Sequence, residues 1–283
     1  MSENQTLKIE VLPPRAGVAW LSQSWTLIRT QTSRLLFLAV LLQLMLGLVQ
    51  LPLLGIFIVM ATPALTAGLL QAFYHVECGQ SFSASILFKP LLMRPQAGRL
   101  LLLGLVLFLV AMLAVSLTLT GVDSVIDPEL RARIEQGDFD AVKQLDPELI
   151  SKMLMGIIVG LSISGSLSFF SIPLIWFRDQ KLMASLIKGL QAMLLNWRAF
   201  IVLALALAAL LLPVSLVMSI LFQVSGQSGI MSFFLLGIIM LIALAFQLLI
   251  FGAQYCAFRA VFNQQVENGE AENPDSNDHQ LVA

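Results

Sequence analysis

The chain lacks charge over long stretches. No Asp, Glu, Lys, Arg or His occurs in four blocks, which are Leu35–Tyr74, Leu100–Val122, Met153–Phe177 and Ala199–Phe258. Charged residues make up 12% of the 283 residues and hydrophobic residues 58%, whereas a water-soluble domain carries about 25% charged residues. The lipid bilayer is therefore the expected solvent of most of the chain.

The residue types that carry most catalysis are also scarce. The chain has two histidines, His75 and His279, and two cysteines, Cys78 and Cys256. One His near one Cys supplies too few ligands for zinc, and no hydrolase, metalloprotease or nucleotide-binding motif occurs. Ion-coupled transport is disfavoured because no charge-free block holds an ionisable coupling residue. We expect no enzyme activity, no catalytic residue, no metal, no cofactor and no structural disulfide.

The lengths of the charge-free blocks predict six membrane spans. About 20 apolar residues cross the hydrocarbon layer, so the blocks of 40 and 60 residues hold two spans each and the others one. The polar break Gln223–Gly229 divides the longest block. The sequence thus predicts an all-α polytopic membrane protein with six transmembrane helices in three hairpins, at about 35–51, 53–73, 100–121, 152–176, 199–222 and 230–255.

The distribution of basic residues predicts the orientation. Lys and Arg are retained in cytoplasmic loops. Twelve of the sixteen basic residues are cytoplasmic if the N-terminus is inside. All Trp and Tyr, which prefer the membrane interface, fall at the same side; they are Trp20, Trp25, Tyr74, Trp176, Trp197 and Tyr255. We expect both termini in the cytoplasm, and a net charge of −1 argues against a nucleic-acid partner.

Each predicted hairpin follows a short segment that ends in an arginine, Arg34, Arg99 or Arg198. The pattern indicates either a threefold repeat or independent placement of an interfacial Arg before each outgoing span. Apolar residues at helical spacing predict amphipathic helices on the cytoplasmic face, the second interrupted by Pro90 and Pro95. The basic and aromatic residues of these segments form a predicted cytoplasmic collar, which comprises Trp25, Arg29, Arg34, Lys89, Arg94, Arg99, Lys181, Lys188, Trp197 and Arg198. The collar either contacts anionic lipid headgroups or only sets the orientation of the spans in the membrane.

The fourth span is rich in small residues. Gly156, Gly160, Ser164 and Ser168 recur every fourth position, a spacing typical of close helix packing in lipid. Two alternatives remain open, a polar lining for a water-filled cavity and a seam between two copies of the chain.

The remaining segments are polar. Residues 122–151 should form an extracytoplasmic helical loop, with Asp127 and Asp146 each as an N-cap before a proline. Residues 1–14 and the acidic tail 263–283 are expected to be disordered. The membrane domain would then comprise residues 15–262.

Two stretches suggest a family. Leu12–Trp20 and Pro63–Gly68 resemble a family of uncharacterised bacterial inner-membrane proteins, similar in layout to the membrane region attached to some glycerophosphodiester phosphodiesterases. The resemblance rests on structural motifs without a catalytic residue. It implies a location in the bacterial cytoplasmic (inner) membrane and a role in envelope or lipid homeostasis.

Three functions are compatible with these features. The first is a non-enzymatic membrane protein whose inner face organises phospholipid, anionic lipid in particular, or a partner protein. The second is a channel or facilitator for a small neutral or amphipathic solute, lined by the serines of the fourth span. The third is an immunity or assembly factor that binds another membrane protein through the face from Gly156 to Ser168.

Overall fold

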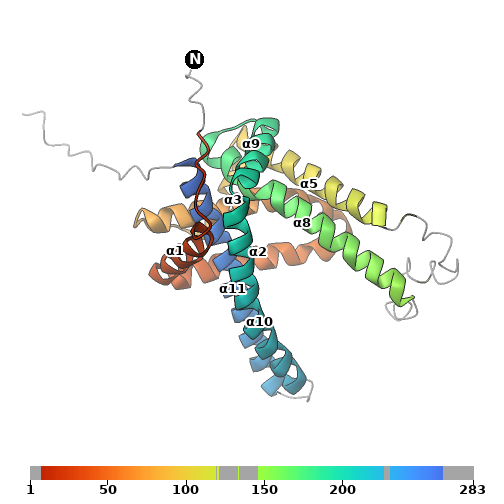
Figure 1. Cartoon of the computed structure of the whole chain (residues 1–283). Coiled ribbons are helices and arrows are strands. Elements are labelled where there is room, and N and C mark those ends of the chain that lie inside the picture. The colour runs from red at the N-terminus through yellow and green to blue at the C-terminus, as the bar shows by residue number, and fades with distance from the viewer. Residues whose placement is uncertain (1–7, 119, 121–132, 134–145, 226–229, 264–283) are drawn as a thin grey trace, which may run out of the picture.

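The structure, a computed structural model, describes residues 8–118, 120, 133, 146–225 and 230–263, and these contain helices but no strand. The order of elements in Figure 1, from the N-terminus, is α1 (Ala16–Thr30), α2 (Thr32–Gly47), η1 (Leu48–Gln50), α3 (Pro52–Glu77), η2 (Ala84–Leu87), α4 (Lys89–Leu92), α5 (Gln96–Thr118), α8 (Pro147–Arg178), α9 (Leu182–Leu195), α10 (Trp197–Ser225) and α11 (Ile230–Phe262).

Six of these helices are long and apolar enough to cross a membrane, which confirms the predicted number and the all-α class. They span Thr32–Gln50, Leu54–Glu77, Gln96–Thr118, Pro147–Arg178, Trp197–Val217 and Phe234–Phe262. Several run beyond the predicted spans, because a helix can continue through its charged flanking residues, as α8 does through Lys152 and Arg178.

Local sequence signals set the helix boundaries. The Asp146 side chain accepts a hydrogen bond from Glu148 N (2.9 Å), with Pro147 at the first helical position, so the predicted N-cap is confirmed and α8 runs directly into the fourth apolar segment. Asp179 ends α8 in the left-handed conformation (φ 49°). The similar Asp127 motif and most of the predicted loop 122–151 lie outside the described residues.

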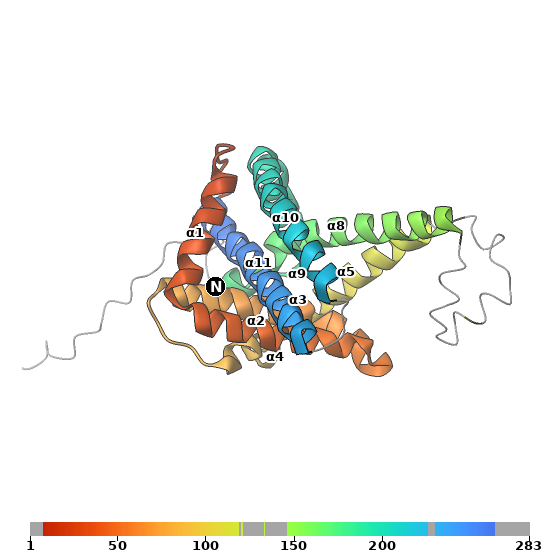
Figure 2. The ribbon, with the colours of Figure 1, turned by 90° about the horizontal axis from the view of Figure 1, so that it is seen from below.

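The apolar helices form arms that meet at one end of the molecule. The helix pairs α2 with α3, α5 with α8 and α10 with α11 are each in contact, and Figures 1 and 2 show the α5–α8 and α10–α11 pairs pointing in different directions. Of the residues in the most apolar stretch of each helix, 67% are buried in α3 and 6% are buried in α10. Helix α3 is therefore central, while α10 exposes its apolar surface.

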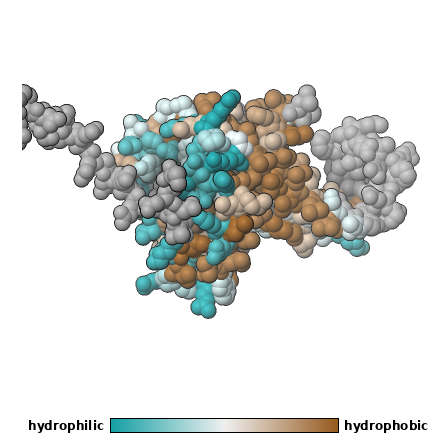
Figure 3. All heavy atoms as spheres, turned by 90° about the horizontal axis from the view of Figure 1, so that it is seen from above, coloured by the Kyte–Doolittle hydropathy of each residue, from teal (hydrophilic) through white to brown (hydrophobic). Residues whose placement is uncertain are grey.

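The buried core lies toward the end of the molecule where α2, α5 and α10 begin and where α3, α8 and α11 end. We call this the basic end, because it carries the Arg and Lys residues that flank the spans. Phe73, Phe170 and Phe258 are fully buried there. Seen from above in Figure 3, hydrophilic residues gather over one part of the surface, and hydrophobic residues cover the part that leads into the α5–α8 arm.

The expectation that residues 1–14 are disordered is wrong for residues 8–14. Glu10 N donates to Val261 O (2.8 Å), and Leu12 N donates to Asn196 Oδ1 (2.8 Å). This extended segment thus joins the end of α11 to the junction of α9 and α10. The polar composition of this segment predicted disorder. Composition does not reveal that a buried asparagine elsewhere in the chain, Asn196, forms hydrogen bonds with the backbone of this segment. Residues 1–7 and 264–283 lie outside the described part of the chain.

Candidate functional site

Helix α9 exposes large apolar side chains at the basic end. Met183, Ile187, Leu190 and Leu194 are between 41% and 68% exposed, and Trp197, the first residue of α10, is 53% exposed. Their spacing of three and four residues places them along one side of the helix. An apolar stripe of this size outside the protein core is suited to contact with lipid.

The opposite side of α9 packs against α8 through small residues. Ser185, Gly189 and Ala192 are buried. A Cβ added at Gly189 would lie 3.2 Å from Ser171 Oγ and 3.3 Å from Phe170 Cβ. Leu182, Leu186 and Met193, which are also apolar, are half-buried. The small residues of α9 therefore form the face that packs on α8, and the large apolar residues are exposed on the other side of the helix.

The predicted collar residues lie at the basic end. They belong to the short helices α1, α4 and α9 and the residues beside them, or to the first turns of α2, α5 and α10. Most are exposed, among them Trp25 at 52%. Lys188 is half-buried. The Arg198 guanidinium lies 5.4 Å from the centre of the Trp197 ring, within the range of a cation–π contact. The exposed members are Trp25, Arg29, Arg34, Lys89, Arg94, Lys181, Trp197 and Arg198.

Arg99 forms an ion pair with a carboxylate of the protein. Its Nη1 lies 2.8 Å from Asp179 Oδ1 and 2.8 Å from the Asp179 carbonyl oxygen. Gln96 Nε2 donates to the same carboxylate (2.9 Å). These bonds join the start of α5 to the turn between α8 and α9. Arg99 thus positions two helices, and its charge is already compensated.

A polar pocket of about 530 Å³ opens between α1 and the ends of α3 and α11. Glu77 forms an ion pair with Arg259 and accepts a hydrogen bond from Tyr255 Oη (2.5 Å). Glu77 therefore links α3 to α11. Its carboxylate is engaged by Arg259 and Tyr255, so it is not available as a metal ligand beside His75 and Cys78. Among the residues that the structure describes, no group of three or more potential ligands surrounds a metal position.

The small-residue stripe of α8 faces α5 over most of its length. A Cβ on Gly160 would lie 3.0 Å from Ala111 O, and one on Gly156 would overlap Thr118 Oγ1. Ser164 Oγ donates to Leu107 O of α5 (3.0 Å). Ser168 instead donates to Gly165 O within its own helix (3.0 Å). Gly156, Gly160 and Ser164 thus allow the two backbones to approach closely.

The serines of α8 do not share one side of the helix. Ser162 and Ser166 donate to Ile158 O (2.7 Å) and Ser162 O (2.8 Å), while Ser164 and Ser168 line a cavity of about 480 Å³ between α3, α5, α8 and α11. Ser162 is exposed on the outer surface. Among the described residues, Ser164 and Ser168 therefore line this cavity, and Ser162 and Ser166 do not.

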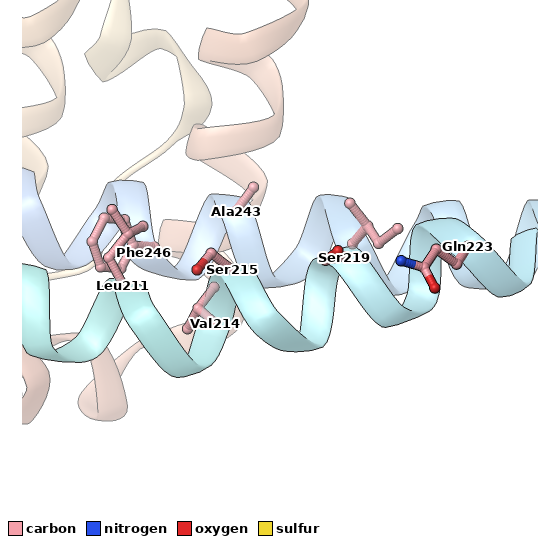
Figure 4. A pocket seen from close by; sticks show the side chains of 8 residues that line it. Leu211, Val214, Ser215, Ser219, Gln223, Ala243 and Phe246 are labelled. Atoms are coloured by element: carbon pink, nitrogen blue, oxygen red, sulfur yellow. The ribbon is translucent and has the colours of Figure 1, made fainter.

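A third hollow, of about 710 Å³, lies along the α10–α11 arm. Figure 4 shows Ser215, Ser219 and Gln223 following one another along α10, with Ala243 and Phe246 contributed by α11. Ser215 Oγ donates to Leu212 O within the helix (2.9 Å). This satisfied hydroxyl is compatible with an apolar environment.

Sequence reasoning missed Asn196 as a structural residue. Its side chain is 1% exposed, accepts from Leu12 N and donates to Glu10 O (3.0 Å) and to Ala192 O (3.0 Å). A lone Asn just after an apolar helical stretch is a signal for a helix end, but it does not identify the distant segment that binds it.

Comparison with known proteins adds no relative. No family model, no curated protein and no solved structure matches the chain.

Proposed function

We propose that this chain is a non-enzymatic, multi-pass protein of the bacterial cytoplasmic membrane that binds anionic phospholipid at its basic end and organises the surrounding lipid. Both termini would face the cytoplasm, and the three helix pairs would cross the bilayer as hairpins. The observation that carries the proposal is the stripe of Met183, Ile187, Leu190 and Leu194 on α9, which is exposed within the part of the chain that the structure describes and adjoins basic residues.

The α9 stripe suits an interfacial position. Its apolar side chains would enter the acyl-chain layer, while Lys181 and Lys188 would extend toward phosphate groups. Trp197 at the end of the stripe is the side chain that favours the headgroup layer most strongly, and Arg198 lies against its ring. A helix with these features supports lipid binding better than a role in topology alone.

The divergent arms support the lipid-organising part of the proposal. The α5–α8 and α10–α11 pairs separate away from the basic end, as Figures 1 and 2 show. Large apolar residues such as Leu113, Leu161 and Leu212 are more than half exposed on these arms. Lipid chains would fill the space between the arms, so that the protein holds a defined set of annular lipids.

The decisive experiment measures lipid-dependent stability of the full-length protein in nanodiscs. Anionic phosphatidylglycerol should raise the unfolding temperature above that in phosphatidylcholine, because a ligand that binds only the folded state stabilises it. Charge reversal by Lys181→Glu with Lys188→Glu should abolish this difference. Each lysine near an anionic surface contributes about 1 kcal/mol, so the pair corresponds to a loss of roughly thirtyfold in lipid affinity.

Lys152→Glu is the matched control, because Lys152 lies on α8 near the opposite end of the α5–α8 arm and its side chain is 49% exposed. This variant should retain the difference between the two lipids. An equal unfolding temperature in both lipids for the unmodified protein, or an unchanged difference in the double variant, would refute anionic-lipid binding at α9.

A further inference from the structure

The cavity of about 480 Å³ between α3, α5, α8 and α11 is a second candidate binding site, separate from α9. Its volume falls within the range of small-molecule sites, about 300–1,000 Å³. None of the described residues that line it is ionisable. A charged ligand would therefore remain uncompensated there, and the site favours a neutral molecule.

Two of the buried side chains that line the cavity are polar. Thr66 and Gln254 are 4% and 5% exposed, and both line it. The Gln254 amide Nε2 donates to Phe169 O (2.8 Å), a carbonyl that Pro173, four residues later, cannot bond. This contact engages one of the two N–H groups of the amide and orients Gln254 Oε1 as an acceptor. The Thr66 hydroxyl forms no hydrogen bond with any residue that the structure describes.

The other hydroxyls of the cavity are already engaged as donors. Thr62 Oγ1 donates to Ile58 O (3.0 Å), Ser164 Oγ to Leu107 O (3.0 Å) and Ser168 Oγ to Gly165 O (3.0 Å). Only their lone pairs remain available to a ligand. Pro63 also removes the hydrogen bond that would reach the carbonyl of Val59, another lining residue. The cavity consequently offers mainly hydrogen-bond acceptors.

The outer part of the cavity is apolar and borders the lipid-facing surface. Leu161 and Met112 line it and are 64% and 46% exposed. A ligand with an apolar tail would thus enter sideways from the bilayer, with its polar group at Thr66 and Gln254 and its tail past Leu161. The buried lining residues Thr66 and Gln254 would contact the polar group of the ligand. The exposed lining residues Leu161 and Met112 would contact its apolar tail.

We propose that this cavity binds a neutral lipid whose head is a hydroxyl group, such as a long-chain alcohol. The hydroxyl hydrogen is donated to Gln254 Oε1, and the hydroxyl oxygen accepts from Thr66 Oγ1. A methyl ether lacks the donor, and a carboxylate carries a charge that the cavity does not compensate. This site is independent of the proposed anionic-lipid surface on α9.

Photolabelling of the full-length protein in liposomes tests the site. The probe is a long-chain alcohol with a diazirine in its tail, and mass spectrometry locates the label. Label is expected on the cavity-lining parts of α5 and α8, near Met112 and Leu161. Excess hexadecanol should compete, whereas hexadecyl methyl ether and the permanently charged hexadecyltrimethylammonium ion should not. Competition by the ether equal to that by the alcohol would overturn the proposal.

Two variants give an independent readout. Thr66→Val keeps the side-chain shape and should weaken labelling about three- to tenfold, the factor expected for one lost hydrogen bond. Ser168→Phe should fill the cavity and abolish specific labelling, while Ser162→Phe on the exposed side of α8 should leave it unchanged. Unchanged labelling in Thr66→Val would overturn the proposal even if Ser168→Phe fails to fold. The lipid-dependent stability at α9 should persist in Thr66→Val, so the two proposals can fail separately.

Discussion

At the scale of single residues, a few polar side chains join helix ends at the basic end; Asn196 is buried, Glu77 is half-buried and Asp179 is exposed. Asn196 joins the α9–α10 junction to the N-terminal segment, Glu77 joins α3 to α11 through Arg259, and Asp179 joins α8 to α5 through Arg99. In an apolar environment such contacts are specific, because an unsatisfied partner has no water to replace the lost bond. These residues fix which helix ends meet.

Asn196→Leu should destabilise the fold by about 1–3 kcal/mol, because Leu12 N and Glu10 O lose their side-chain partners. The segment that these groups anchor should detach first. Denaturant unfolding in detergent measures the loss of stability, and limited trypsin digestion should show faster cleavage at Lys8 and Arg15. Gln191→Leu, at an exposed position of the same helix, is the control and should change neither. Equal digestion of Asn196→Leu and the unmodified protein would disprove the anchoring role.

At the scale of helices, close approach is set by glycine and serine. Gly104 of α5 faces the backbone of α3, where an added Cβ would overlap Met60 O. Gly156 and Gly160 play the same part between α8 and α5, and Gly189 between α9 and α8. Packing through small residues replaces the hydrophobic effect, which does not drive helices together within lipid.

Two glycines of α5 should respond in opposite directions to the same substitution. Gly104→Ala should cost about 1–3 kcal/mol, because the added methyl group forces α3 and α5 apart. Gly98→Ala should be neutral or stabilising by up to about 1 kcal/mol, because a Cβ there meets no atom within 4 Å and alanine favours the helix. Thermal unfolding in detergent compares the two. A smaller loss for Gly104→Ala than for Gly98→Ala would contradict the packing of α3 on α5.

The helices also show where sequence reasoning reached its limit. The predicted spans and the N-cap at Asp146 follow from composition and local motifs, and both are found. The apolar periodicity of α9 predicted a helix, but not that Ser185 and Gly189 would turn toward α8 while Ile187 and Leu194 remain exposed. That choice depends on the surface of α8, which periodicity within one helix does not reveal.

At the scale of the whole molecule, the core is concentrated at the basic end and the apolar arms diverge from it. A water-soluble protein would not expose so much apolar surface. The distribution predicts one orientation in the bilayer, with the basic end in the cytoplasm.

Cysteine labelling tests this orientation. In a cysteine-free background made by replacing Cys78 and Cys256, Lys188→Cys should react with an impermeant maleimide only after the membrane is opened. Lys152→Cys should react in intact cells, because Lys152 lies at the opposite end of the α5–α8 arm. Reaction of both cysteines from the same side would invert or abolish the predicted topology.

The sequence by itself determined that the chain has six apolar helices and which of their ends carry the charges. Both properties follow from the cost of placing each charged residue in hydrocarbon, a cost that belongs to the residue alone and can be read position by position. Only the tertiary structure decided three features. Asn196 forms hydrogen bonds with the backbone of Glu10 and Leu12, α9 exposes its large apolar side chains, and Thr66 and Gln254 line the same cavity. These features depend on pairs of surfaces far apart in the chain, and their fit arises only when the helices pack.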